Sequence, residues 1–135
     1  MSARFSTFSV NGASLSPRLQ RLKADVEAVA SAAWAFAAVS IVRRQLRTSG
    51  LAGVRVPLAM PFDAAGRGVE AVLWRRGSCL ETSLVRQEWL RAHGQSVDVV
   101  IGVRGPSNFG AHAWLDGQEA HSSEEFVEIR RHRAR

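Results

Sequence analysis

Residues 78–94, with the sequence SCLETSLVRQEWLRAHG, decide how this chain of 135 residues folds. Their apolar side chains recur every three or four positions, which predicts an amphipathic helix, and Gly94 is typical of a helix end. Ser78 followed three residues later by Glu81 matches a capping box, in which each side chain bonds the backbone N–H of the other residue. The sequence therefore predicts a helix that begins just after Ser78, with Cys79 in its first turn.

A different pattern follows this helix. Apolar residues alternate at positions 97, 99, 101 and 103, as in a strand with one buried face. Residues 109–115 are predicted to form a second strand, Asp116 and Gly117 a tight turn, and residues 118–121 a third strand. Helices therefore precede a small antiparallel sheet, which is an α+β fold.

The N-terminal half is predicted to be helical from residue 17 to about residue 47, with Ser16 as the N-cap and Gly50 at the end. Its apolar side chains are expected in the core, among them Leu19, Leu22, Val26 and Val29. The uncharged run at 28–42 is shorter than the roughly 20 residues that span a bilayer, so no transmembrane segment is expected.

We expect one compact domain in three parts. Residues 1–15 are polar and should form a flexible N-terminus, residues 16–65 a helical scaffold, and residues 66–135 the core that carries the chemistry. The basic run at residues 130–135 is expected to be solvated and frayed.

Composition excludes several classes of protein. The chain is 46% hydrophobic and 22% charged, which is typical of a globular protein and not of a disordered one. Its single cysteine excludes an intramolecular disulfide and a four-cysteine zinc site, and it suits the reducing cytoplasm. Lys23 is the only lysine, so the net charge of +6 comes from arginine, which favours acidic partners. No nucleic-acid reader motif accompanies these arginines, so a basic nucleic-acid-binding protein is the last-ranked alternative.

Cys79 and His112 are the residues that could carry chemistry. The first turn of a helix favours the thiolate, and its free backbone amides could stabilise an oxyanion. An imidazole at His112 could take the thiol proton if its strand packs against the helix start. The bland alternatives are a small buried cysteine and a merely hydrogen-bonded histidine. A metal site of His112 and His121 lacks a third ligand, so neither a metal nor a cofactor is expected.

Three short motifs, in this order, resemble one family. They are Cys-Leu-Glu-Thr-Ser-Leu at 79–84, Val-Val-Ile-Gly-Val-Arg at 99–104, and Ala-His-Ala-Trp at 111–114. Over residues 69–117 the chain resembles the transglutaminase-like leader peptidases of lasso-peptide biosynthesis, the C-terminal peptidase domain of the lasso B protein. The resemblance implies a papain/transglutaminase-like fold in which residues 66–135 form the cysteine peptidase core.

The resemblance also implies an activity and its partners. The chain would be a cytoplasmic hydrolase that cleaves the leader from a ribosomally synthesised precursor peptide, before a macrolactam-forming cyclase acts. Cys79 would be the nucleophile, His112 the general base and then acid, and Trp114 a packing residue beside them. A separate leader-recognition protein is implied as a partner, because this chain is too short to contain both units.

The resemblance leaves open which acid orients the imidazole of His112. In the family it follows the hairpin after the His-Ala-Trp motif, but the hairpin is shorter here. If Asp116 and Gly117 form a two-residue turn, Glu119 would lie on the same face as His112, and we predict that it serves. The alternatives are Asp116, Ser122 and Glu124. Because the family's acid is missing, a non-catalytic peptide-binding module of the same fold is the alternative function.

Overall fold

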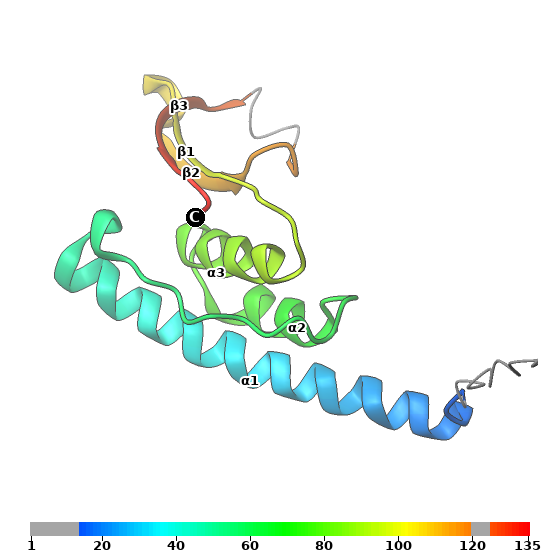
Figure 1. Cartoon of the computed structure of the whole chain (residues 1–135). Helices are drawn as coiled ribbons and strands as arrows, with labels where there is room; N and C mark the ends of the chain where they lie inside the picture. The colour runs from blue at the N-terminus through cyan, green and yellow to red at the C-terminus, as the bar shows by residue number, and fades with distance from the viewer. Residues whose placement is uncertain (1–13, 120–124) are drawn as a thin grey trace, which may run out of the picture.

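The computed structural model describes residues 14–119 and 125–135 and has an α+β architecture (Figure 1). Three helices come first, α1 (Pro17–Ser49), α2 (Arg67–Arg76) and α3 (Cys79–Ala92). Three strands follow, β1 (Val99–Arg104), β2 (Gly110–Leu115) and β3 (Val127–His132). Two short 3-10 turns, η1 (Leu51–Gly53) and η2 (Pro106–Asn108), lie in the connections. Helices precede an antiparallel sheet, so the predicted fold class is confirmed.

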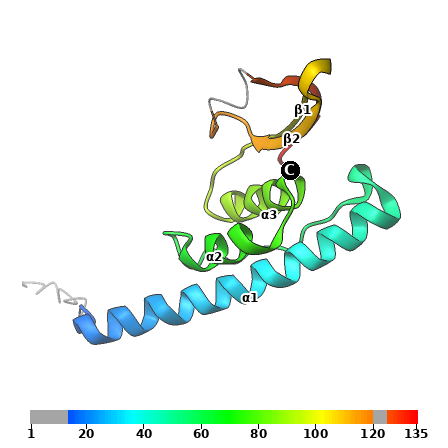
Figure 2. The ribbon, with the colours of Figure 1, turned by 180° about the vertical axis from the view of Figure 1, so that it is seen from behind.

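The elements form three layers. Figures 1 and 2 show α1 along one side, α2 and α3 in the middle, and the sheet on the far side of α3. One face of the sheet packs on α3 through a shared core that contains Leu84, Leu90, Val99, Ala113 and Leu115. This packing places the start of α3 and the strand β2 against each other, and both carry predicted site residues.

The long helix α1 begins and ends as the sequence predicts. The Ser16 hydroxyl accepts a hydrogen bond from the Leu19 N–H, and Gly50 follows the last turn with φ +66°. Its buried face carries small residues, which let α2 approach closely. A Cβ added to Gly68 would lie 1.9 Å from the carbonyl oxygen of Ala28, so this crossing requires glycine.

The apolar residues in the first half of α1 do not reach the core. Leu19, Leu22, Val26 and Val29 are 50%, 59%, 60% and 70% exposed, so the prediction that they are buried is wrong. The reason is that the start of α1 runs beyond α2 and α3 (Figures 1 and 2), and that near Ala28, where Gly68 of α2 packs, the side chains of Val26 and Val29 stay uncovered. Among the described residues, α1 is also a helix long and apolar enough to cross a membrane, and 28% of its most apolar window is buried.

The sheet has the strand order β2-β1-β3, with both pairs antiparallel. The first two predicted strands are confirmed, but the third is wrong. Gln118 belongs to a turn, where its N–H donates to the Leu115 carbonyl at 3.0 Å, and the described part of 118–121 forms no strand. His121 lies outside the described residues.

The third strand is instead formed by the basic C-terminal segment, which we expected to be frayed. β3 pairs with β1, with Val99 opposite His132 and Val100 opposite Arg131. Carboxylates compensate its charge, because Arg131 forms ion pairs with Asp98, Asp116 and Glu128. This strand is hard to predict from the sequence for two reasons. It is rich in arginine, and the strand with which it pairs lies about thirty positions earlier.

Candidate active site

Cys79 is the first residue of α3, and its side chain is exposed. The predicted capping box holds this end of the helix. The Ser78 hydroxyl accepts from the Glu81 N–H at 3.3 Å, and the Glu81 carboxylate accepts from the Ser78 N–H at 3.0 Å. The thiol therefore lies at a rigid, capped helix N-terminus, where backbone amides and the helix dipole favour negative charge.

Arg43 on α1 also holds the start of α3 in place. Its Nε and Nη2 each donate to the Glu81 carboxylate at 3.0 Å, and Nη2 also donates to the Arg76 carbonyl at 2.6 Å. The hydrogen bond from Arg43, helped by the Ser78 N–H, outweighs burial and lowers the pKa of Glu81 below its usual 4.5. The sequence analysis missed this pair because its partners are 38 positions apart; an arginine at the end of an apolar run is the only local signal.

His112 lies on β2, within reach of an acid. Its Nε2 is 3.2 Å from Oε2 of Glu119. The ring lies against two aromatic side chains, with centroid distances of 6.0 Å to Trp114 and 5.4 Å to Phe126. Trp114 is 3% exposed, so it forms a firm wall beside the imidazole.

The turn after β2 explains why Glu119 can reach the imidazole. Asp116 and Gly117 are its central residues, and Gly117 has φ +75°, which glycine adopts without strain. Among the acids weighed from the sequence, Asp116 points elsewhere and pairs with Arg131. Ser122 and Glu124 lie outside the described residues.

The structure brings β2 against the start of α3 without joining the thiol to the imidazole. The Ser83 hydroxyl, one turn after Cys79 on the same helix face, donates to the Ala113 carbonyl at 3.1 Å. Side chains alternate along a strand, so His112 lies on the sheet face opposite Ala113 and Leu115. Among the hydrogen bonds of the described residues, none joins Cys79 to His112.

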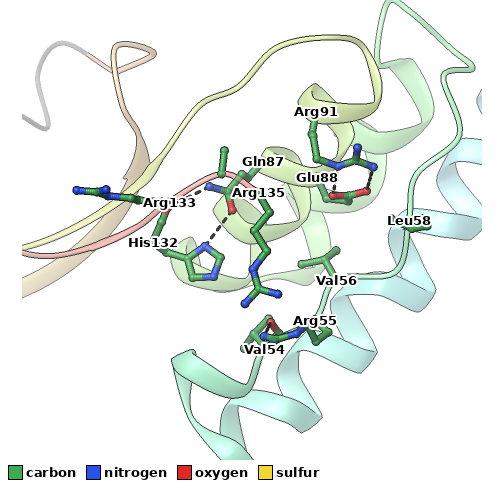
Figure 3. Close-up of a pocket in the computed structure, with 11 residues that line it drawn as sticks. Val54, Arg55, Val56, Leu58, Gln87, Glu88, Arg91, His132, Arg133 and Arg135 are labelled. Atoms are coloured by element: carbon green, nitrogen blue, oxygen red, sulfur yellow. Dashed lines mark hydrogen bonds and ion pairs between the residues drawn. The ribbon is translucent and has the colours of Figure 1, made fainter.

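Two hollows lie near these elements. An open one of about 370 Å³ reaches Glu119 and is bordered by Glu70, Arg86 and Trp89. A cavity of about 380 Å³ lies farther along α3, between residues 54–58 and the end of β3 (Figure 3). Among the described residues, no group of three His, Cys, Asp or Glu side chains could hold a metal ion.

A cysteine at a capped helix start, a histidine on the neighbouring strand and a carboxylate just after that strand define the class: an α+β protein with the parts for thiol chemistry. The chain belongs to the transglutaminase-like superfamily, whose family model matches residues 28–130. Members of this superfamily often carry cysteine-protease or transglutaminase activity. The match extends well beyond the motifs at 69–117 and includes the second half of α1 and most of β3. No curated protein and no solved structure matches the chain.

Proposed function

We propose that this chain is a cytoplasmic cysteine peptidase that removes the leader from a ribosomally synthesised precursor peptide during lasso-peptide maturation. The observation that carries the proposal is the His112–Glu119 pair, whose histidine lies on a strand held against the capped helix that begins at Cys79. The three motifs of the sequence supply the substrate class. A separate leader-recognition protein would present the precursor, and a macrolactam-forming cyclase would take the product.

In this mechanism the Glu119 carboxylate holds Nε2 of His112, which leaves Nδ1 to accept the thiol proton. The Cys79 thiolate attacks the carbonyl carbon of the last peptide bond of the leader. Backbone amides at the start of α3 donate to the oxyanion that forms. His112 then gives its proton to the departing amine, and the leader remains as a thioester on Cys79. Water, activated by His112, hydrolyses the thioester and frees the thiol.

In the proposed mechanism, His112 reaches Cys79 only when the substrate is bound. Catalytic hydrogen bonds are often long or poorly aligned in a free enzyme and tighten when substrate binds. β2 is an edge strand of the sheet, so its side chains can reach around the edge without crossing another strand.

The experiment is cleavage of the cognate precursor, with the recognition protein present, followed by mass spectrometry. Wild type should release the leader and Cys79→Ala should not. Glu119→Gln should slow cleavage, whereas its matched control Asp116→Asn should leave the rate nearly unchanged, because Asp116 pairs with Arg131. Equal cleavage by wild type and Cys79→Ala would overturn the proposal.

A non-catalytic peptide-binding module is the second candidate. The observation that favours it is that the thiol and the imidazole form no hydrogen bond, although both are described. A module of this kind would bind the labelled leader, measured by fluorescence anisotropy, with the same affinity in wild type and Cys79→Ala and without cleavage by either.

A further inference from the structure

The cavity in Figure 3 is lined by several arginines and by an apolar wall, and the proposed chemistry does not use it. Val54, Val56 and Leu58 line one side and come from the extended segment between η1 and α2. The opposite side is the extended end of the chain after β3, and the floor is α3. A channel between two extended segments has the shape of a stretched peptide.

The charge of this cavity is positive and largely uncompensated. Among its lining residues the one carboxylate side chain, that of Glu88, is already paired with Arg91 through two hydrogen bonds of 2.7 and 2.8 Å. Among the hydrogen bonds of the described residues, the Arg55 guanidinium donates to the Ala52 and Val54 carbonyls and to no carboxylate. Within the described residues the guanidinium groups of Arg133 and Arg135 have no carboxylate partner, and Glu88 is the one acidic side chain that lines the cavity.

Figure 3 shows the Arg135 side chain reaching into the space between His132 and the wall of Val54 and Val56. An arginine held over apolar surface without a carboxylate is a ready partner for a bound one, because its planar fork matches two carboxylate oxygens.

His132 adds a hydrogen-bond acceptor at a defined place. The Gln87 amide Nε2 donates to the carbonyls of Val97 and His132, at 2.9 and 3.1 Å. Its Oε1 must therefore accept from Nδ1–H of His132, at 3.1 Å. This tautomer leaves Nε2 as an acceptor, and burial, followed by the charge of Arg135, lowers the pKa of His132 and keeps the ring neutral.

The wall also offers backbone groups. Among the hydrogen bonds of the described residues, none engages the N–H or the carbonyl of Val56, which is half-buried beside the cavity. A peptide laid along this wall could pair with both groups, as a strand added to an edge does.

We propose that this cavity binds an extended segment of the substrate peptide that carries an acidic side chain next to an aliphatic one. The carboxylate binds Arg135 and Arg55, the aliphatic side chain packs on Val54, Val56 and Leu58, and a peptide N–H donates to His132. The cavity lining does not include Cys79, His112 or Glu119, so the segment binds apart from the scissile bond. Its assignment to the leader rests on the proposed peptidase function.

The test measures binding without turnover. A fluorescein-labelled peptide, Gly-Leu-Glu-Leu-Gly, is titrated with the full chain carrying Cys79→Ala, and fluorescence anisotropy gives the affinity. Replacing the glutamate of the probe by glutamine should weaken binding about tenfold, because the charge-assisted bonds are lost. The double variant Arg55→Gln and Arg135→Gln should weaken binding of the glutamate probe by a similar factor and make both probes equal. The matched control Arg44→Gln, which removes an arginine outside the cavity, should bind as the parent does.

Equal affinity for the two probes, or an unchanged affinity in the double variant, would overturn the proposal. Displacement of the probe by inorganic phosphate as effectively as by unlabelled peptide would also overturn it, because the cavity would then be a general anion site. In cleavage assays the same double variant should raise KM and leave kcat unchanged. Loss of probe binding and loss of cleavage are separate readouts, so an inactive chain that still binds the probe would overturn the peptidase and not this site.

Discussion

Replacing Glu81 by glutamine should loosen the start of α3 and so the position of the thiol. The Glu81 side chain is 10% exposed and accepts three hydrogen bonds, two from Arg43 and one from Ser78, each at 3.0 Å. Glutamine has the same shape but no charge and only one acceptor oxygen, so one Arg43 donor would face an NH₂ group. Charge-assisted bonds are about twice as strong as neutral ones, so the loss should be about 2 to 3 kcal/mol.

Urea unfolding followed by circular dichroism measures this loss, and a thermal scan should show a fall of about 10 °C in Tm. The control is Glu70→Gln, which removes a carboxylate with the same two-pronged contact to Arg86 but at a site that is 53% exposed. Exposed ion pairs contribute little, so the control should lose less than about 1 kcal/mol.

The pH dependence gives a second readout for the same variant. The pKa of Glu81 is lowered in the folded protein, so the unfolded chain binds its proton more readily. The stabilisation is therefore present above the usual value of 4.5 and is lost as the pH falls below it. Wild type should show this loss and Glu81→Gln should not. The reasoning would be refuted if Glu81→Gln and Glu70→Gln lost the same unfolding free energy, and if wild type and Glu81→Gln lost stability equally below pH 4.5.

Two further predictions concern the scaffold. Gly68→Ala should destabilise the chain far more than Gly105→Ala in urea unfolding, because the added Cβ meets the Ala28 carbonyl at 1.9 Å in the first case and nothing within 4 Å in the second. His132 should make stability fall as the pH drops through 6.5, since burial lowers its pKa in the folded state and the unfolded chain takes up the proton. The unfolding free energy of His132→Gln, measured in urea at a series of pH values, should not show that fall. A fall of equal size in the variant would show that another group causes it.

Local signals were sufficient to predict α1, α3 and the place of the thiol. The N-caps Ser16 and Ser78 and the glycine after α1 act within four positions, so the sequence around each one contains all the needed information. The Asp116–Gly117 turn is local in the same way, but the strand that we expected after it, and from which the place of Glu119 was inferred, does not form in the described residues.

Long-range pairings could not be predicted from the sequence. β3 forms only because β1 offers a free edge, and Arg43 meets Glu81 only because α1 crosses under α3. The exposure of Leu22 and Val26 has the same origin, because their spacing suits burial but no element of the described chain covers them. In each case the outcome depends on whether an element distant in sequence packs there, and a local pattern holds no information about that.

His112 activates Cys79 in the proposed substrate complex, and the most direct test is the rate at which iodoacetamide alkylates the only cysteine of the folded chain with the leader peptide bound. At mildly acidic pH an ordinary thiol is almost fully protonated and reacts slowly. We predict that wild type reacts at least about tenfold faster than His112→Ala, with Glu119→Gln in between and Asp116→Asn unchanged. The same alkylation rate in wild type and His112→Ala, with both chains folded, would contradict the claim.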